Sequence, residues 1–598
     1  MTTPSKALAG ALILSIVLTP PLAAGAAPIK TTSKTAVKTP VATGSGGAVA
    51  TISQKASESA IAILDKGGNA IDAAVAAAAT LGVTDPFSCG IGGGGLMVIY
   101  LAKDKRVVTV DHRETAPAAF SPAVFLENGK PIDFDTAVAS GASVGVPGTV
   151  RGWHEALERY GTMSFKQVLA PAIDVASKGF TVSETFNHLV TENERKFQQF
   201  TSTSQLYLRN GKAVPTGTLL KNPDLAKTYR ELAAKGYKAF YQGPLAQAIV
   251  GAVNRPPLSE GVSVRSGNMT LADLANYEAR IRQPIRSTYR GYDVYGMPLP
   301  SSGGIAVAEA LNILEGFDLK KMPRPNVEHL YLEASRLAFA DRNAYLADPE
   351  YVDAPVEGML SKGFAAQRRS LIKPERAAGV VPAGDAFLYE NDQSFPLRPR
   401  QNVIQQEGLH TTHLTVSDKE GNVVSYTFTI ESWGGSGIVV PGYGFLLNNE
   451  MTDFDFTGPA PNIPEAGKRP RSSMAPTIVM KDGKPAFSIG SPGGATIITT
   501  VLQTIVNHLD LGMPMDQAID APRLSQRNAR ETSVEPGFIG SAQAKTLEAF
   551  GHKWETSPAP EEIGAANAIV FNQDGTVTAV SEVRRHGIGS ALVQKRGH

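Results

Sequence analysis

One short stretch, residues 411–431 (TTHLTVSDKEGNVVSYTFTIE), constrains the fold of this chain more than any other. Two runs rich in Thr, Val and Tyr flank a Lys-Glu-Gly-Asn turn, which predicts a β-hairpin with strands over 413–418 and 423–430. Residues 363–408, directly upstream, are polar and show no clear periodicity. The pattern therefore predicts a strand that begins immediately after an irregular segment.

The rest of the chain mixes helical and strand patterns. Residues 48–83 and 326–349 have apolar residues at helical spacing, and TIITTVLQTIVNHLD (residues 496–510) predicts a further helix. A second hairpin is predicted over Asp574-Gly575. Strands followed by helices and then by strands favour an α+β fold, a layered sandwich with antiparallel sheets, over βαβ winding.

Composition narrows the functional classes. The 598 residues exceed one ordinary hydrophobic core, so two or more domains or one large intertwined unit are expected. Lys plus Arg number 57 and Asp plus Glu number 56, which gives a net charge of +1. Binding a polyanion requires a basic surplus, so this balance argues against nucleic-acid binding. Cys89 is the only cysteine, which excludes an intrachain disulfide and favours a buried packing role.

The N-terminus has the features of an export signal. A basic residue precedes an apolar run, and Ala-Gly-Ala at 24–26 has the small-x-small pattern that signal peptidase accepts. A Pro-Pro pair keeps the run too short to span a membrane, and a retained anchor is the alternative. We expect a signal peptide over 1–26, a disordered leader over 27–47, and a periplasmic or secreted protein.

The run Gly90 to Gly95 formally matches G-x-G-x-x-G, the fingerprint of dinucleotide-binding sites. That fingerprint requires a strand before the glycines and a helix after them, whereas here a strand, LMVIY, follows. The run therefore predicts a close backbone crossing rather than a nucleotide site. The histidines and the cysteine never have the spacing of H-E-x-x-H or C-x-x-C, so no metal site stands out.

Thr411 is the candidate nucleophile. A threonine hydroxyl attacks poorly unless a base lies beside it, and an N-terminal threonine provides that base through its own α-amine. This amine has a reference pKa of about 7.7–8.0, which suits a general base near neutral pH. The bond between His410 and Thr411 would first have to be cut. Because two threonines at a strand start also fit plain β-propensity, the assignment depends on accompanying groups.

Those accompanying groups lie mostly in the C-terminal third of the chain. Gly493 and Gly494 precede a predicted helix, so their N–H groups could stabilise an oxyanion, at roughly 3 kcal/mol per donor. Arg113 lies in an earlier predicted strand, RVVTVDHRE. The other candidates carry hydroxyl or carboxylate groups: Thr429, Glu431, Glu450, Asp453, Ser472 and Ser473. For each residue alone, a surface ion pair or a turn is the competing interpretation.

The motifs and their order resemble the gamma-glutamyltranspeptidases (glutathione hydrolases), which are N-terminal-nucleophile enzymes. The resemblance covers nearly the whole mature chain and rests on nine motifs: the glycine run 90–95, DHRETAP, VGVPGTVRGW, LPSSGGI, FADRNAYLADP, TTHLTVSDKEGNVVSYT, LLNNEMTDF, KRPRSSMAPTIV and GSPGG. It implies a four-layer αββα sandwich. It also implies self-cleavage at His410–Thr411 into a large subunit, 48–410, and a small catalytic subunit, 411–598, which remain together as a heterodimer.

The resemblance also gives each candidate a role. Thr411 matches the nucleophile, Thr429 matches the hydroxyl that bonds to it, and Gly493 and Gly494 match the oxyanion hole. Two sets match the groups that hold the head of a γ-glutamyl substrate: Arg113, Ser472 and Ser473 for the α-carboxylate, and Glu431, Glu450 and Asp453 for the α-ammonium. Arginine can bind a carboxylate bidentately, and clustered carboxylates need a bound cation or a proton. No metal or organic cofactor is expected.

We therefore expect γ-glutamyl transfer and hydrolysis on glutathione and related amides, with water, amino acids or peptides as acceptors. Two alternatives stay open: a cephalosporin (glutaryl) acylase or polyglutamate transpeptidase of the same fold, and a non-catalytic exported binding protein. Glu431 and Glu450 replace the Asn and Gln of some bacterial members, and Trp433 is unusual. Residues 455–467 form a shorter segment than in members with a lid loop, which predicts an open pocket.

Overall fold

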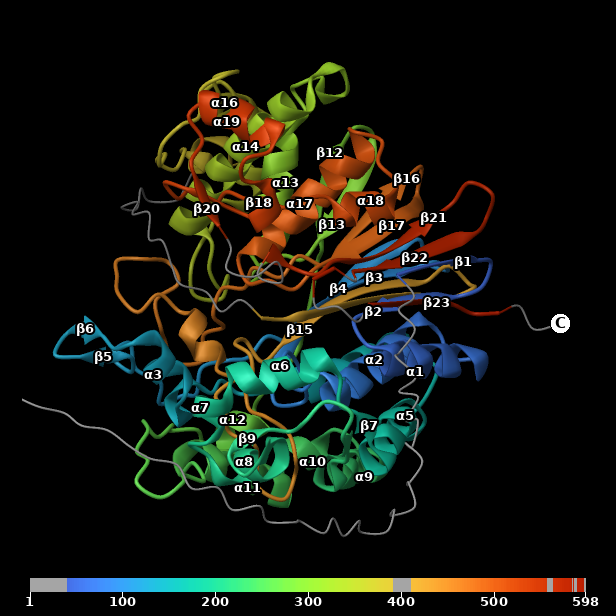
Figure 1. Cartoon of the computed structure of the whole chain (residues 1–598), viewed down its shortest axis with the longest axis vertical. Coiled ribbons are helices and arrows are strands. Elements are labelled where there is room, and N and C mark those ends of the chain that lie inside the picture. Colours follow the sequence, from blue (N-terminus) through green and yellow to red (C-terminus); the bar gives the residue numbers. More distant parts are fainter. Residues whose placement is uncertain (1–39, 391–409, 557–562, 583, 586–588, 596–598) are drawn as a thin grey trace, which may run out of the picture. The chain divides into compact units, whose positions relative to one another are not determined.

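Two seven-stranded sheets lie at the centre of the described chain, with helices on the outer face of each (Figure 1). The computed structural model describes residues 40–390, 410–556, 563–582, 584–585 and 589–595. Sheet A contains, in spatial order, β11 (Arg280–Arg282), β4 (Arg106–Asp111), β3 (Gly94–Leu101), β15 (Val423–Thr429), β14 (Thr412–Ser417), β2 (Ala48–Thr51) and β23 (Ser590–Val593). Sheet B contains β1 (Val41–Gly44), β22 (Val577–Ser581), β21 (Asn567–Phe571), β17 (Lys484–Gly490), β16 (Thr477–Lys481), β13 (Tyr292–Gly296) and β12 (Ile285–Tyr289).

Each layer of helices shares a hydrophobic core with one sheet. Helices α1 (Gln54–Asp65) and α2 (Ala70–Thr84) pack against sheet A, and the alanine-rich α2 is buried along almost its whole length. Helices α13 (Gly303–Leu314) and α17 (Thr496–Leu509) pack against sheet B, and α14 (Arg324–Tyr345) packs on α13. All pairings between neighbouring strands of the two sheets are antiparallel. The fold is therefore the predicted α+β sandwich with four layers, αββα.

The two sheets face each other partly through small side chains. Ala48 and Ala50 of β2 share a buried cluster with Ile569 of β21, Ala579 of β22 and Ala591 of β23. Nearby, β14 packs on β21 and β15 packs on β17. Because alanine side chains are short, the backbones of the two sheets can approach closely where this cluster lies.

Strands β14 and β15 form the predicted hairpin, within one residue of the expected bounds. Two other expectations are wrong. Residues 48–51, which the helical pattern predicts as helix, form β2 because they pair with β14 and β23. Residues 41–44, predicted to belong to the disordered leader over 27–47, form β1 beside β22. The predicted signal peptide lies outside the described residues.

The glycine run allows two backbones to cross where β3 begins. A Cβ on Gly93 would lie 1.9 Å from the carbonyl oxygen of Thr429, and a Cβ on Gly92 would lie 2.0 Å from that of Leu446. Only glycine fits at such separations, so the predicted close crossing is confirmed. Gly93 thereby fixes the position of the end of β15, where Thr429 lies.

His413 holds the two sheets together. A Cβ on Gly490 of β17 would lie 2.3 Å from the His413 ring, and Asn567 of β21 donates to the His413 carbonyl oxygen at 2.9 Å. The ring Nδ1 lies 2.8 Å from the hydroxyl oxygen of Thr427. Burial lowers the pKa of His413 to about 3, so the ring is neutral at physiological pH. The histidine of the Thr-Thr-His sequence therefore has a packing role.

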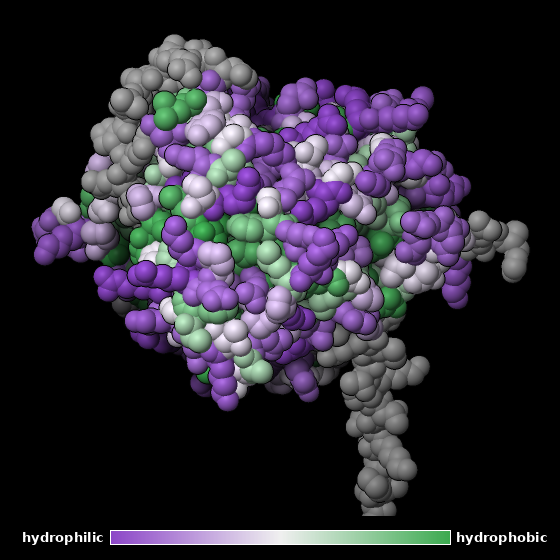
Figure 2. Space-filling view, turned by 90° about the horizontal axis from the view of Figure 1, so that it is seen from above, coloured by the Kyte–Doolittle hydropathy of each residue, from purple (hydrophilic) through white to green (hydrophobic). Residues whose placement is uncertain are grey.

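The face shown in Figure 2 is largely covered by hydrophilic side chains, with apolar side chains in separate patches between them. Across the described parts of the chain, no helix combines the length and the apolarity that crossing a membrane requires. The single cysteine, Cys89, is buried, as predicted.

Gly93→Ala should lower the free energy of unfolding by about 3 kcal/mol, because the new methyl group overlaps the Thr429 carbonyl oxygen. Gly251→Ala is the matched control. Gly251 lies inside α11 (Gly243–Asn254) with no atom within 4 Å of its would-be Cβ, so alanine should stabilise the fold by about 0.5–1 kcal/mol. Thermal unfolding of both purified variants measures the difference. Equal melting temperatures would contradict the close crossing.

Candidate active site

The hydroxyl of Thr429 contacts both residues of the bond that is predicted to be cut. It donates to the carbonyl oxygen of His410 at 2.9 Å, and the Thr411 hydroxyl is directed at it from 3.4 Å. The backbone N–H of Glu431 donates to the same oxygen at 2.7 Å. A hydroxyl has one proton and two lone pairs, so these three contacts use its full capacity. Thr429 can thus orient the Thr411 hydroxyl and polarise the His410 carbonyl group.

The hairpin brings Thr411 and Thr429 together. Strand β14 begins at Thr412, which pairs with Phe428 of β15, so Thr411 lies opposite the end of β15. Both threonines are buried, with 7% of Thr411 and 2% of Thr429 exposed. The neighbouring Thr412 differs, because its hydroxyl is buried and has no hydrogen-bond partner among the described residues. Of the two adjacent threonines, only Thr411 therefore contacts Thr429.

Arg113 lies within a buried charge cluster. Its guanidinium forms ion pairs with Glu450 and Asp453. It also donates to the carbonyl oxygens of Pro470 and Arg471, each at 3.2 Å. Burial alone would lower the pKa of Arg113, but the two carboxylates outweigh burial and raise it. The predicted carboxylate-binding residue and two predicted ammonium-binding residues are thus ion-paired with each other.

The cluster contains more carboxyl groups than cations. Glu114 lies close to Glu450, and both carboxyl oxygens of Glu114 and Oε2 of Glu450 are buried with no hydrogen-bond donor among the described residues. Burial raises the pKa of Glu114 to about 8 and that of Glu450 well above its usual range. Burial also raises the pKa of Glu431, and the charges of Asp453 and Glu450 add to the effect. The cluster therefore retains protons at neutral pH, and a bound cation would favour their release.

Glu431 connects this cluster to Thr429. Its backbone has a φ of 79°, a left-handed conformation that is uncommon outside glycine, and its carboxyl group accepts a hydrogen bond from the Asn449 amide. The turn that follows is held by Lys196, whose ammonium group donates to the carbonyl oxygen of Trp433 at 2.5 Å. Burial lowers the pKa of Lys196 to about 8, while the charge of Glu431 opposes that decrease.

Ser472 and Ser473 lie on a segment that runs beside residues 298–303. The N–H and the hydroxyl of Ser302 both donate to the Ser472 carbonyl oxygen, at 2.8 and 2.7 Å. The Ser472 hydroxyl accepts from the N–H of Met474 at 3.1 Å, and the Ser473 hydroxyl accepts from Arg342 at 2.6 Å. Since each hydroxyl accepts an N–H, its own proton is directed at another acceptor.

Gly493 and Gly494 form the turn that leads into α17. Their φ values of 130° and 53° are both positive, and a Cβ on Gly493 would lie 2.5 Å from the hydroxyl oxygen of Thr496. Glycine is therefore required at this turn. The next residue, Ala495, lines the same cavity as His410. The turn thus borders the cavity that His410 also lines, and its role as an oxyanion hole stays a prediction.

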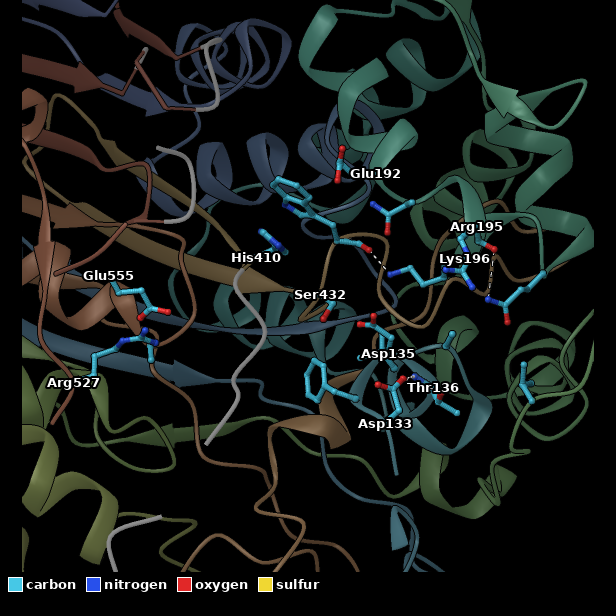
Figure 3. Close-up of a pocket in the computed structure, with 18 of the residues that line it drawn as sticks. Asp133, Asp135, Thr136, Glu192, Arg195, Lys196, His410, Ser432, Arg527 and Glu555 are labelled. Carbon is cyan, nitrogen blue, oxygen red and sulfur yellow. Dashed lines mark hydrogen bonds between the residues drawn. The ribbon is translucent and has the colours of Figure 1, made fainter. Parts of the chain in front are cut away.

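A cavity of about 1230 Å³ lies beside that bond. Figure 3 shows His410 and Ser432 between charged side chains from distant segments, with Arg527 and Glu555 on one side and Lys196 on the other. Small-molecule sites commonly measure roughly 300–1,000 Å³, so this cavity is large. None of residues 455–467 lines this cavity, so the open pocket that the short segment predicts stays a prediction.

Four residues of the site received no role from the sequence. Glu114 and Arg342 lie inside DHRETAP and FADRNAYLADP, two of the motifs that carry the family resemblance, so these motifs could have indicated both residues as site candidates. Trp433 is noted only as unusual, and its ring stacks on that of His410 with the centroids 3.7 Å apart. Lys196 carries no sequence signal, because only the folded chain brings α7 (Glu194–Phe197) beside the turn after Glu431.

A second group of potential ligand atoms lies away from these residues. His329, Glu333 and His552 are buried, and their nearest nitrogen and oxygen atoms lie within 4.8 Å of one another. The sequence spacing did not predict this group, because His552 is distant in the chain. His329 Nδ1 lies 2.8 Å from His552 Nε2, and Glu333 is engaged by Arg336 and by the Ala378 N–H. These contacts engage all three side chains, as a hydrogen-bonded imidazole pair beside an ion pair, and leave only Nδ1 of His552 without a hydrogen-bond partner among the described residues.

The fold and the site together define a class of protein. A four-layer αββα sandwich, with a buried threonine at the start of an inner strand, is the architecture of N-terminal-nucleophile hydrolases.

Comparison with known proteins identifies the family within that class. The profile of gamma-glutamyltranspeptidase matches residues 56–592. A glutathione hydrolase proenzyme from Bacillus subtilis (strain 168) is 40% identical over 592 residues, with 98% of each chain covered. An acylase ACY 1 proenzyme from Pseudomonas sp. (strain SE83) is 38% identical, with 92% of this chain and 94% of that protein covered. The structure of a cephalosporin acylase from Bacillus halodurans matches with a TM-score of 0.82 at 28% identity, covering 95% of this chain and 99% of that one.

The chain therefore belongs to the gamma-glutamyltranspeptidase family and is an enzyme. The alternative of a non-catalytic binding protein is accordingly set aside.

Glu114→Gln should reduce the loss of stability between pH 5 and pH 8. The unfolded chain loses the Glu114 proton near pH 4.5, whereas the folded chain keeps it until about pH 8. Its stabilising contribution is thus complete below about pH 4.5 and is lost as the pH rises toward 8. Glutamine cannot ionise, so the melting temperature of the variant should fall by roughly 2 °C less than that of the parent.

Glu158→Gln, on the exposed surface of α4 (Thr149–Tyr160), is the control and should follow the parent protein at every pH. Parallel melting curves for Glu114→Gln and the parent across this range would mean that Glu114 holds no proton in the folded chain.

Proposed function

We propose that the chain cuts itself before Thr411 and that the freed Thr411 then transfers γ-glutamyl groups from glutathione and related amides. Water, amino acids or peptides accept the group. The observation that carries this proposal is the Thr429 hydroxyl, which contacts both the His410 carbonyl oxygen and the Thr411 hydroxyl. Membership of the gamma-glutamyltranspeptidase family supports the choice of acyl group.

In the cutting step, the Thr411 oxygen attacks the carbonyl carbon of His410. A new C–O bond forms, the C–N bond of the peptide breaks, and the hydroxyl proton moves to the departing Thr411 amine. The Thr429 hydroxyl donates to the His410 oxygen, where negative charge develops during the attack. Water then hydrolyses the ester and leaves a carboxylate on His410 and a free hydroxyl on Thr411.

In the turnover step, the Thr411 amine accepts the proton of the Thr411 hydroxyl, and the oxygen attacks the γ-carbonyl carbon of the substrate. The N–H groups of Gly493 and Gly494 stabilise the resulting oxyanion. The leaving amine takes the proton from the Thr411 amine, and a glutamyl ester on Thr411 remains. Attack by water or by an acceptor amine releases the glutamyl group and restores the hydroxyl.

The charge cluster provides selectivity for a zwitterionic head group. An α-carboxylate would bind Arg113 and the hydroxyls of Ser472 and Ser473. An α-ammonium would bind Glu431, Glu450 and Asp453, whose burial and mutual repulsion make a cation favourable. Arg113 is ion-paired with Glu450 and Asp453 in the cluster. A bound zwitterion would replace these pairs with equivalent ones, its carboxylate contacting the arginine and its ammonium contacting the acids.

We further propose that the protein is exported, with residues 1–26 as its signal peptide, to the periplasm or beyond. The mature enzyme is then a heterodimer of residues 48–410 and 411–598, or a close variant that includes β1 in the large subunit.

Thr411→Val should yield one uncut chain with no transferase activity, because valine keeps the β-branched shape but lacks the attacking oxygen. Thr412→Val is the matched control. It removes a hydroxyl without a hydrogen-bond partner among the described residues, so it should cut normally and change kcat/KM by less than about twofold. Intact-mass analysis and N-terminal sequencing measure the cut, and a γ-glutamyl anilide measures turnover. Normal maturation of Thr411→Val would remove Thr411 as the nucleophile.

A second candidate function is acyl transfer from another donor, as in a cephalosporin (glutaryl) acylase or a polyglutamate transpeptidase. Two observations favour it: the match to the Bacillus halodurans acylase structure and the cavity of about 1230 Å³, which has room for a bulky leaving group. A glutaryl group lacks the ammonium, however, and would leave the acidic residues without a cation. The γ-glutamyl donor is therefore the better fit.

A γ-glutamyl anilide should give a kcat/KM roughly 10- to 100-fold above that of the matching glutaryl anilide, since hydrogen bonds to charged groups contribute about 1.5–3 kcal/mol. The two donors differ only in the ammonium group, so the ratio measures the acidic residues directly. A ratio below one would favour the acylase.

A further inference from the structure

Arg342 joins three segments of the active site through one guanidinium group. It lies near the C-terminal end of α14, is 2% exposed and lines the cavity beside His410. Its Nε donates to the Ser302 hydroxyl at 2.8 Å, and one terminal nitrogen donates to the Ser473 hydroxyl at 2.6 Å. The other terminal nitrogen donates to the side-chain oxygen of Asn343 at 2.8 Å. The planar fork is therefore fixed in one orientation.

This contact determines how the Ser473 hydroxyl can act. A guanidinium has only donors, so Ser473 must accept from Arg342, and its single proton is directed at a different acceptor. Acceptance from a cation also polarises the O–H bond and makes the hydroxyl a stronger donor. The Ser302 hydroxyl also accepts a hydrogen bond from Arg342, and it donates its own proton to the Ser472 carbonyl oxygen at 2.7 Å. Arg342 thereby fixes the backbone of Ser472 and the hydroxyl of Ser473 together.

Arg342 also brings a guanidinium to the carboxylate-binding hydroxyls, where Arg113 is already engaged by acidic residues. Arg113 already pairs with Glu450 and Asp453, so its positive charge is compensated within the cluster. An anionic ligand that reaches Ser473 meets a second guanidinium, that of Arg342, on the far side of the hydroxyl. A hydroxyl that accepts from a guanidinium is a stronger donor to an anion, so Arg342 would strengthen an anion site that Arg113 alone serves poorly.

The geometry points to Arg342 as a positioning residue for the substrate α-carboxylate, acting through the Ser473 hydroxyl. This inference rests on the proposed γ-glutamyl function and adds to it a residue whose role is specificity for a carboxylate-bearing donor.

The test compares two donors that differ only in the α-carboxylate: γ-glutamyl anilide and 4-aminobutyryl anilide. Arg342→Gln should raise KM for the γ-glutamyl donor by roughly 10- to 100-fold with kcat changed by less than about threefold, the size expected for a charge-assisted hydrogen bond. KM for the 4-aminobutyryl donor should change by less than about twofold. Arg342→Lys retains the charge without the fork, so it should recover only part of the loss.

Two further variants separate a specific effect from a general disturbance of α14. Arg336→Gln removes an equally buried arginine of the same helix, which bonds Glu333 and Ala529 and does not line the cavity, and should leave both KM values unchanged. Ser473→Ala should reproduce the Arg342→Gln effect, and the double variant should be no worse than Ser473→Ala alone.

The possible outcomes distinguish a failure of the positioning role of Arg342 from a failure of the proposed γ-glutamyl function. Equal changes for the two donors, or additive effects of Arg342→Gln and Ser473→Ala, would overturn the positioning role while leaving the γ-glutamyl activity of the parent protein intact. Absence of turnover of γ-glutamyl anilide by the parent protein would instead overturn the proposed function. If Arg342→Gln does not fold, KM for the two donors is compared in Arg342→Lys and in Ser473→Ala instead.

Discussion

The active site depends on one oxygen atom, the hydroxyl of Thr429. It joins the N–H of Glu431, the hydroxyl of Thr411 and the carbonyl oxygen of His410, and it has no capacity for a fourth contact. Its position follows from the backbone, because the close approach of Gly93 fixes the end of β15 and the hairpin register fixes Thr411 opposite it. A one-residue slip between β14 and β15 would place the two threonines on opposite faces of the sheet. The chemistry is therefore a consequence of strand register as much as of residue type.

Electrostatics impose the second constraint. Arg113 is buried among carboxyl groups contributed by segments that are far apart in the chain, and the excess negative charge is relieved by protons rather than by more cations. Such a cluster is costly to bury, and strongly perturbed ionisable groups of this kind are typical of a functional site. Ser432, which follows Glu431 in the chain, lines the large cavity. A zwitterion offers a carboxylate to the arginines and an ammonium to the acids. The cluster is thus complementary to an amino-acid head group, and less so to an acyl group without charge pairs.

Local patterns in the sequence predicted the parts of the fold that local forces determine. The hairpin of β14 and β15, the helix α17 and the glycine crossing all follow from turn residues, periodicity or the lack of a side chain. Strands β1 and β2 could not be predicted, because their short, alanine-containing segments become strands only by pairing with distant partners. The roles of Arg342 and Lys196 were hidden for the same reason. A sequence shows that an arginine lies on a helix, but only the folded chain shows which hydroxyls it reaches.

Both sheets combine strands from the two sides of residue 411. In sheet A, β14 lies between β2 and β15, and β15 lies between β14 and β3; in sheet B, β16 of the later segment lies beside β13 of the earlier one. The two main hydrophobic clusters each combine residues from both sides of residue 411, so the native arrangement is most readily reached while the chain is still one molecule. If the backbone is cut before Thr411, as proposed, unfolding becomes an irreversible loss: the two fragments, diluted apart, would need a bimolecular encounter to rebuild sheets that a tethered chain assembles within itself. Resistance to inactivation is then governed by the rate of opening, and not by an equilibrium between native and denatured enzyme.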